Sequence, residues 1–344
     1  MLQDLFLQDS LQQDSLQQDS YLQDSFGREF HYLRLSVTDV CNFRCTYCLP
    51  DGYQGRPDSA FLSLDEIRRV AAAFAATGTG KVRITGGEPS VRADLAEIIA
   101  AVKATPGIRT VALTTNGYRL AERIHDWAAA GLDALNLSID SLDPAVFTAI
   151  TGHSRLRDLL AGLDRALALG IPRVKVNAVL LRGQNDDQID RFLDWIRNLP
   201  ITLRFIELMQ TGDNAEFFRR HHVSGEALRR RLLESGWNPV LRSRDAGPAQ
   251  EFHHPDYQGR IGLIQPYGKD FCATCNRLRV SALGRLHLCL FSEQGIDLRH
   301  LLQADAQREE LIDFLRARLA DKKISHFLHD GFSGGTRHLA MIGG

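Results

Sequence analysis

From about residue 31 the chain alternates between short strand-like runs and longer segments with the apolar spacing of helices. The strand-like runs cover 31–38, 81–85, 110–115, 134–139, 173–181 and 202–208. Helical segments follow them near 63–77, 92–104, 119–130, 143–150 with 155–169, and 187–198. Ser63-Leu-Asp-Glu66 is a capping box, which marks the start of the first helix. Serial strand–helix units with short connections predict a parallel sheet with helical crossovers.

Three regions follow from this pattern. Residues 28–214 predict an α/β fold, an incomplete (β/α)6 barrel, because the regular alternation stops near residue 210. Residues 215–344 predict helices at 224–235 and 306–322 with short strands between them, a smaller α+β region covering the open side of the barrel. Residues 1–27 contain a five-residue repeat that cannot line one helix face, which indicates a disordered leader.

Composition narrows the class of protein. The 344 residues carry a net charge of −1, which argues against a nucleic-acid binder. No apolar run approaches the roughly 20 residues that cross a bilayer, and the first 27 residues contain no Lys or Arg, unlike a secretory signal. We therefore expect a cytoplasmic protein without a membrane partner. In that compartment thiols stay reduced, so the six cysteines are expected to be ligands rather than disulfides.

The cysteines form two triplets. Cys41, Cys45 and Cys48 follow the first strand with the spacing C-x3-C-x2-C, and Cys272, Cys275 and Cys289 lie near the end of the chain with the spacing C-x2-C-x13-C. Three thiolates can hold three irons of a 4Fe–4S cluster and leave the fourth iron open to a small molecule. Zinc is the alternative, and it prefers four ligands. For the second triplet, His287 could be the fourth.

Two further patterns carry a resemblance. The first triplet, with Tyr47 inside it, resembles the signature of the radical SAM superfamily, and Gly86-Gly87-Glu88-Pro89 resembles the GGEP motif of that superfamily. The pair of triplets, the NRLR sequence at 276–279 and the final Gly343-Gly344 closely resemble the MoaA family, the GTP 3′,8-cyclases of molybdenum cofactor biosynthesis. Segments such as KVRITGGEP, TTNGYRL, LSIDSLD and DFCATCNRLRVS extend this resemblance from about residue 28 to the end.

The resemblance implies a lyase with two 4Fe–4S clusters. The first cluster would reduce S-adenosylmethionine, and the resulting radical would remove hydrogen from C3′ of GTP, so that C3′ joins C8 to give 3′,8-cyclo-7,8-dihydro-GTP. The second cluster would bind the guanine. By position, the resemblance implies S-adenosylmethionine contacts at Tyr47, Gly86, Gly87, Glu88, Ser138 and Met209. It implies GTP contacts at Arg34, Lys81, Arg83, Thr114, Lys175, Arg204, Arg277 and Arg279, with catalytic roles for Arg277, Arg279 and the Gly343-Gly344 tail.

The charge pattern supports an anionic substrate independently. Five cations interrupt strand-like runs that should be apolar in a buried parallel sheet: Arg34, Lys81, Arg83, Lys175 and Arg204. Buried cations need anionic partners, and a triphosphate would supply them. Alternatively, some of the five face outward or pair with acidic neighbours.

Two other functions are compatible with the sequence. One is a radical SAM maturase with an auxiliary cluster, although such enzymes usually carry more cysteines near the C-terminus. The other is a zinc-binding scaffold without activity. The resemblance further implies an electron donor such as flavodoxin or ferredoxin, a cyclic pyranopterin monophosphate synthase as the next enzyme, and a monomer or homodimer.

Overall fold

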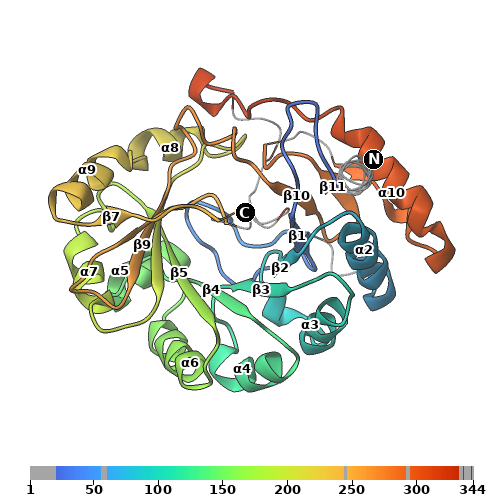
Figure 1. Ribbon diagram of the computed structural model, residues 1–344. Coiled ribbons are helices and arrows are strands. Elements are labelled where there is room, and N and C mark those ends of the chain that lie inside the picture. Colours follow the sequence, from blue (N-terminus) through green and yellow to red (C-terminus); the bar gives the residue numbers. More distant parts are fainter. Residues whose placement is uncertain are drawn as a thin grey trace, which may run out of the picture.

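The computed structural model describes residues 21–55, 60–243, 246–291, 295–332, 336 and 342. All six strands expected from the sequence are present: β1 (Tyr32–Ser36), β2 (Lys81–Thr85), β3 (Thr110–Thr115), β4 (Ala134–Ser138), β5 (Arg173–Leu180) and β6 (Thr202–Glu207). They pair in parallel and in chain order. The helices between them lie outside the curved sheet (Figure 1), as right-handed crossovers require.

The helices confirm most of the predicted segments. The barrel contains α2 (Leu64–Ala76), α3 (Leu95–Lys103), α4 (Leu120–Ala129), α5 (Pro144–Thr151), α6 (Leu156–Ala168) and α7 (Ile189–Ile196), and the later region contains α8 (Ala215–His221), α9 (Glu226–Glu234) and α10 (Arg308–Leu319). The sequence did not predict α8. This helix has seven residues and buries none of them, so it has no apolar stripe that a periodicity argument could detect.

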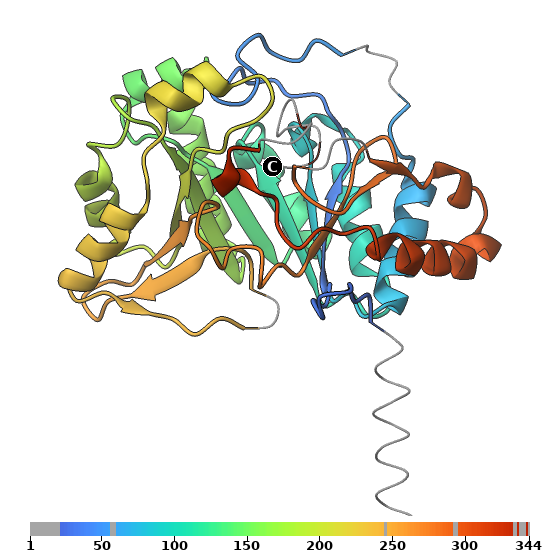
Figure 2. The same cartoon turned by 90° about the horizontal axis from the view of Figure 1, so that it is seen from above.

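The C-terminal region extends the barrel sheet at both edges. Its strands are β7 (Asn238–Pro239), β8 (Gln250–His253), β9 (Arg260–Ile264), β10 (Arg277–Val280), β11 (Arg285–His287) and β12 (Ile296–Asp297). β9 pairs in parallel with β6, and β10 pairs in parallel with β1. The sheet order is β12-β11-β10-β1-β2-β3-β4-β5-β6-β9-β8-β7, so the described strands form one open sheet rather than a closed barrel. The incomplete barrel is thereby confirmed. Figure 2 shows the light-orange strands of the β6 edge on the left and the red α10 on the right, and Figure 1 shows β10 and β11 on the side of α10.

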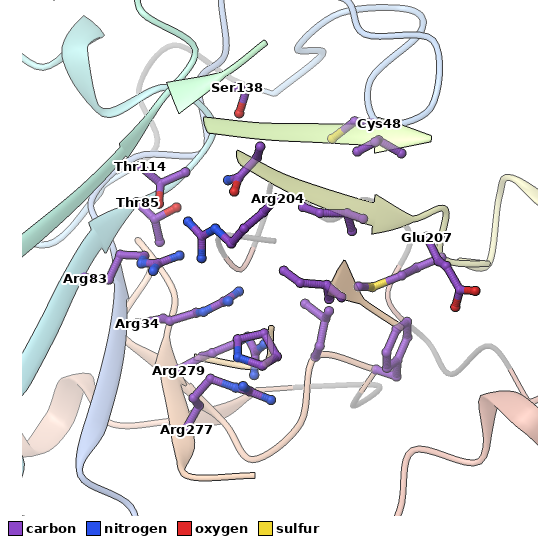
Figure 3. Close-up of a pocket in the computed structure, with 18 of the residues that line it drawn as sticks. Arg34, Cys48, Arg83, Thr85, Thr114, Ser138, Arg204, Glu207, Arg277 and Arg279 are labelled. Atoms are coloured by element: carbon purple, nitrogen blue, oxygen red, sulfur yellow. The ribbon is translucent and has the colours of Figure 1, made fainter. Parts of the chain in front are cut away.

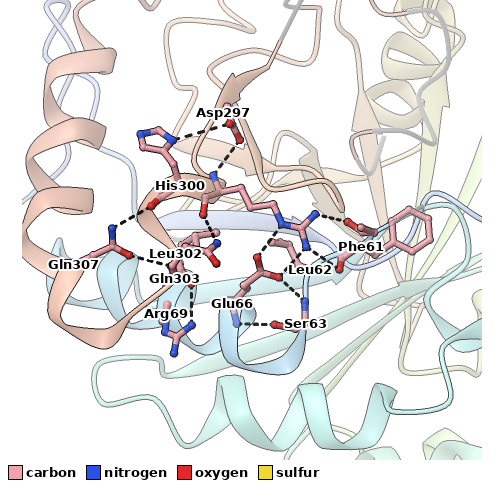
Figure 4. A network of polar contacts seen from close by, with 12 residues as sticks. Phe61, Leu62, Ser63, Glu66, Arg69, Asp297, His300, Leu302, Gln303 and Gln307 are labelled. Atoms are coloured by element: carbon pink, nitrogen blue, oxygen red, sulfur yellow. Dashed lines mark hydrogen bonds and ion pairs between the residues drawn. The ribbon is translucent and has the colours of Figure 1, made fainter. Parts of the chain in front are cut away.

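Polar contacts tie this region to the first barrel helix. The predicted capping box is present: Glu66 N–H donates to Ser63 Oγ at 3.2 Å, and Ser63 N–H donates to Glu66 Oε2 at 2.8 Å. Arg299, which follows β12, donates from Nε to Glu66 Oε1 at 2.8 Å (Figure 4). One carboxylate therefore both starts α2 and holds the C-terminal region against it.

The N-terminal segment contributes to the core. Residues 1–20 of the predicted leader lie outside the described residues, but 21–27 are described, and there Leu22 is fully buried. Phe30 N–H donates to the Leu22 carbonyl at 2.9 Å, and Gln23 forms a bridge with Glu29. Among the described residues, we find no helix with the length and apolar character of a membrane span.

Candidate active site

A single cavity at the carboxyl ends of the parallel strands is lined by all six cysteines. Parallel barrels place their ligands at this end. Of the other residues singled out from the sequence, the cavity is lined by Tyr47, Gly86, Gly87, Thr114, Ser138, Met209, Arg34, Arg83, Arg204, Arg277 and Arg279. Glu88, Lys81 and Lys175 are not among its lining residues, and Gly343 and Gly344 lie outside the described residues. The fold thus brings together two triplets that are more than 200 residues apart in the chain.

The first triplet lies in a loop that leans on the end of α5. Thr46 N–H donates to the Ile150 carbonyl at 2.9 Å, and Cys48 N–H donates to the Cys45 carbonyl at 3.0 Å. Burial, the largest cause, raises the pKa of the Cys41 thiol to about 11 and raises that of Cys45 well above its usual range. Thiolates here are therefore costly unless a cationic group such as iron binds them.

The two glycines of the GGEP motif pack against the backbone that leads into this loop. Gly87 N–H donates to the Thr38 carbonyl at 2.8 Å. A Cβ on Gly87 would lie 2.4 Å from the Val40 carbonyl oxygen, and one on Gly86 would lie 2.2 Å from the Thr38 carbonyl oxygen. Gly86 also has a φ of +148°. Only glycine fits this close approach.

Glu88 is turned into the protein. It is fully buried, and its Oε1 accepts from Thr115 Oγ1 at 2.6 Å and from Ser90 N–H at 2.9 Å. Its Oε2 accepts from Asn116 N–H at 2.6 Å. Burial, the largest cause, raises the pKa of the Glu88 carboxyl. Glu88 thus links the end of β2 to the end of β3. It holds Thr115 and Asn116, which line the cavity, without lining the cavity itself.

Asp140 is a cavity residue that sequence reasoning missed. Tyr47 Oη donates to Asp140 Oδ2 at 2.9 Å, and Val179 N–H donates to Asp140 Oδ1 at 2.9 Å. Burial raises the pKa of Asp140 to about 6. The carboxylate fixes the Tyr47 side chain between the first triplet and β5. Its position directly after the fourth strand was the available signal.

The second triplet lies among cations. Cys275 N–H donates to the Cys272 carbonyl at 3.1 Å, and Arg277 Nη2 lies 3.8 Å from Cys275 Sγ. Burial alone would raise the pKa of Cys275, but Arg277 and then Lys322 lower it to about 6. Lys322 is buried and donates to the Leu288 carbonyl. At Cys275 this environment favours the thiolate, the form that binds iron, whereas burial raises the pKa of Cys272.

His287 is the residue that could have completed a zinc site at the second triplet. Within the described ranges, no three His, Cys, Asp or Glu side chains are close enough to hold one metal ion. His287 is opposite Arg279 in the β10–β11 pair and is not a cavity residue. Burial, followed by Arg279, lowers its pKa to about 4. The three cysteines of each triplet line the cavity, and three thiolates can hold three irons of a 4Fe–4S cluster.

Arginines form a row across three adjacent strands. Arg34 of β1 is the register partner of Arg83 in β2 and of Arg279 in β10. Figure 3 shows these side chains, with Arg277 and Arg204, pointing into one cavity from different strands. Nε of Arg83, Arg204 and Arg279 has no hydrogen-bond partner among the described residues. Like charges held this close in a buried site call for an anionic ligand.

Arg204 enters the cavity from β6, where the opposite strand leaves room for it. Its register partner in β9 is Gly262, and a Cβ there would lie 2.7 Å from Arg204 Cγ. Arg204 Nη2 donates to Asn136 Oδ1. Burial, and then the charge of Arg83, lowers the pKa of Arg204 to about 9. Burial and Arg83 therefore disfavour the charged form of Arg204, and a bound anion would stabilise it.

The two lysines lie lower in the barrel, near the amino ends of their strands. Lys81 Nζ is 4.7 Å from the centroid of the Tyr32 ring. Lys175 Nζ is 2.6 Å from Glu251 Oε1 of β8, so Lys175 pairs with an acidic neighbour, the alternative that the sequence left open. A phosphate would have to share Lys175 with this carboxylate.

Comparisons with known proteins agree with this geometry. The family model "Radical SAM superfamily" matches residues 35–196, and "Molybdenum Cofactor Synthesis C" matches residues 201–328. The fold and the first triplet therefore define a member of the radical SAM superfamily. Within it, the chain belongs to the GTP 3′,8-cyclase family. It is 60% identical to the GTP 3′,8-cyclase of Yersinia pestis over 93% of this chain and 98% of that one, and 58% identical to that of Vibrio parahaemolyticus over 93% and 96%.

Among solved structures, the fold is similar to that of Streptococcus suis SuiB bound to S-adenosylmethionine. The TM-score is 0.55 with 15% sequence identity, and the match covers 87% of this chain and 68% of SuiB. At this identity the likeness concerns the fold alone. It agrees with the open parallel sheet flanked by helices and extended by a C-terminal region.

Proposed function

We propose that this protein converts GTP to 3′,8-cyclo-7,8-dihydro-GTP, the first step of molybdenum cofactor biosynthesis. The observation that carries this proposal is the single cavity that both cysteine triplets and the arginine row line together. One end of the cavity suits a radical-generating group, and its floor suits a polyphosphate. The 60% identity to a GTP 3′,8-cyclase over nearly the whole chain supports the same substrate.

In this proposal Cys41, Cys45 and Cys48 hold one 4Fe–4S cluster, and Cys272, Cys275 and Cys289 hold another. When bound, the first cluster supplies the electron that splits S-adenosylmethionine, and the second supplies an open iron for the guanine. Gly86, Gly87, Tyr47, Ser138 and Met209 would contact S-adenosylmethionine. Of these, Tyr47 is held in place by Asp140, so its orientation is fixed before any ligand binds.

The chain's own residues would hold GTP by charge. Arg34, Arg83, Arg204 and the deeper lysines would neutralise the triphosphate, and Thr114 would donate a hydrogen bond from the end of β3. Arg277 and Arg279 would lie beside the guanine and the second cluster. Phe271, Leu290 and Phe291 line the cavity near the second triplet and would keep water away from the reacting atoms.

We propose a one-electron donor of the flavodoxin or ferredoxin type, cyclic pyranopterin monophosphate synthase as the next enzyme, and a cytoplasmic location. The Gly343-Gly344 tail would enter the cavity during catalysis. Deleting both glycines tests this role: activity should fall, and full activity after the deletion contradicts it.

The decisive experiment is an anaerobic incubation of reconstituted protein with GTP, S-adenosylmethionine and a reductant. We expect about eight irons per chain from two clusters, together with 5′-deoxyadenosine and a cyclised GTP. A peptide-modifying maturase would form 5′-deoxyadenosine without consuming GTP, so that outcome contradicts the proposed substrate. Cys289→Ser should lower the iron content to about four per chain, whereas an unchanged content contradicts the two-cluster assignment.

A further inference from the structure

Tyr32 is a buried phenol beneath the arginine row that no step of the proposed function uses. It lies two residues before Arg34 in β1, so both side chains face the inside of the barrel. Only 1% of Tyr32 is exposed. Its hydroxyl has no hydrogen-bond partner among the described residues. A buried hydroxyl without a partner costs about 1–3 kcal/mol, so its place here needs an explanation.

Cations surround this phenol. Lys81 Nζ lies 4.7 Å from the ring centroid and Arg83 Cζ lies 5.4 Å from it, both over the face of the ring. The register partners of Tyr32 are Lys81 in β2 and Arg277 in β10. The charged groups facing Tyr32 are Arg34 of β1, Lys81 and Arg83 of β2, Arg277 and Arg279 of β10, and Arg204 of β6, with the Lys175–Glu251 pair beyond them.

We propose that Tyr32 is an ionisable counter-charge of the polyphosphate site: its phenolate balances part of the cation cluster when the site is empty, and it takes up a proton when a polyphosphate binds. The buffered solvent supplies the proton, and no other bond is made or broken. The inference rests on the proposed function only in placing a polyphosphate against the arginine row.

The electrostatics give the direction of the coupling. Burial alone would raise the pKa of Tyr32, but Arg83, Arg34, Lys81 and Arg204 together lower it to about 7. A bound polyphosphate adds several negative charges to the same cluster, and a nearby negative charge raises the pKa of a phenol. By linkage, binding is then accompanied by proton uptake, and affinity falls as the pH rises above about 7.

The test compares the holoenzyme with Tyr32→Phe. This variant keeps the ring under the cations and removes only the hydroxyl, which has no hydrogen-bond partner among the described residues. Titration calorimetry under anaerobic conditions gives the Kd for GTP at about pH 6 and about pH 8. We expect the two proteins to bind GTP equally at the lower pH. At the higher pH, Tyr32→Phe should bind GTP up to about tenfold more tightly than wild type, since a one-proton linkage changes affinity tenfold per pH unit.

Proton uptake is the second readout. Titrations in buffers of different ionisation enthalpy should show that wild type takes up more protons than Tyr32→Phe. Protons that GTP itself takes up are the same for both proteins, so they do not contribute to this difference. Tyr257→Phe is the matched control, because Tyr257 is a tyrosine outside the cavity that stacks on Arg197, and it should behave as wild type. Equal affinities and equal proton uptake for wild type and Tyr32→Phe at both pH values overturn the inference.

Inorganic triphosphate separates this inference from the proposed substrate. It carries the charge that the cation cluster would recognise but has no guanine or ribose. If it shows the same Tyr32-dependent proton uptake while GTP is not converted, the inference holds and the proposed reaction fails. If GTP is converted while neither ligand shows the difference between wild type and Tyr32→Phe, the reaction stands and the counter-charge role is wrong.

Discussion

Arg28 Nη1 donates a hydrogen bond to the carbonyl oxygen of Cys272 at 3.1 Å and so joins the N-terminal segment to the second cysteine triplet. The same guanidinium donates to the carbonyl oxygens of Ile324 at 2.8 Å and Lys323 at 2.7 Å. Its Nε lies 2.6 Å from Asp24 Oδ2, in an ion pair whose acidic side chain is fully buried. Three segments that are distant in the chain therefore meet at one side chain, which lines the cavity.

Replacing this side chain should damage the second iron site before the first. Arg28→Met leaves the Asp24 carboxylate buried without its partner, and breaking a buried ion pair in this way costs about 3–5 kcal/mol. We expect urea unfolding of the iron-free protein to show this loss. In reconstituted protein, iron content should fall from about eight towards four per chain, while cleavage of S-adenosylmethionine at the first triplet persists.

Arg68→Met is the matched control for Arg28→Met. Arg68 pairs with Asp65 on the surface of α2, where more than half of each side chain is exposed. Such pairs contribute about 0–1 kcal/mol, so stability and iron content should stay close to wild type. If Arg28→Met retains all its iron and its stability, the guanidinium does not hold the second triplet.

Gly87→Ala tests the backbone contact behind the first triplet. The new Cβ would lie 2.4 Å from the Val40 carbonyl oxygen and 2.6 Å from that of Asp39, so the loop that leads to Cys41 must move. A misplacement of about 1 Å can cost roughly 100-fold in rate. We expect a loss of that size in 5′-deoxyadenosine formation, with the second iron site intact. Gly247→Ala should leave the rate unchanged, because its Cβ would meet nothing within 4 Å. A normal rate for Gly87→Ala would show that the loop has room to adapt.

Local chemistry made much of this architecture predictable. The capping box at Ser63 and Glu66 placed the start of α2 correctly, and the spacing of the cysteines located both triplets. These features are encoded within a few residues of one another, or by side chains that have few other uses. Arg34, Arg83 and Arg204 were predictable for a similar reason, since a cation inside a buried strand is unusual wherever it occurs, whereas Arg279 was indicated only by the family resemblance.

The parts that escaped prediction are contacts between distant segments. In the sequence alone, Arg28 resembles a surface arginine and Asp140 resembles a turn residue. The fold brings Arg28 to the Cys272 carbonyl and Asp140 to the Tyr47 hydroxyl. Lys175 had two possible partners, and only the pairing of β8 with β9 brings Glu251 to it. Sequence periodicity carries no information about which polar groups meet across 76 or 244 residues.

Glu66 should contribute stability that depends on pH. Although burial raises its pKa, the hydrogen bonds from Arg299 and Ser63 lower it below the usual value. A carboxyl with a depressed folded-state pKa stabilises the fold above its unfolded pKa, and this contribution is lost as the pH falls through the folded-state pKa. We expect Glu66→Ala to cost about 1–2 kcal/mol at pH 7 and less in acid below the folded-state pKa, where a protonated Glu66 still accepts from Ser63 N–H but no longer faces Arg299 with a charge.

Glu66→Gln separates the two roles of this side chain. A glutamine at this position keeps the capping box, because its side-chain oxygen still accepts from Ser63 N–H, but it loses the charge that faces Arg299. Its stability at pH 7 should lie between those of wild type and Glu66→Ala when measured by urea unfolding. A constant difference between wild type and Glu66→Ala across the pH range would contradict an ionic contribution.

The ion pair between Lys175 and Glu251 should affect the affinity for GTP. Their side chains are each 23% exposed and their charged atoms lie 2.6 Å apart. Burial alone would raise the pKa of Glu251, but Lys175 lowers it, so the carboxylate is ionised at neutral pH.

If Lys175 contacts a phosphate of GTP, Glu251 competes for the same ammonium group. Glu251→Gln should then bind GTP more tightly than wild type, whereas Lys175→Met should bind it roughly tenfold more weakly, as expected for the loss of one charged hydrogen bond. Calorimetric Kd values for the two variants and the double variant measure the coupling. Glu226→Gln, which breaks the exposed pair with Arg229, should leave the Kd unchanged. Weaker GTP binding by Glu251→Gln would mean that the carboxylate positions Lys175 for the phosphate instead of competing with it.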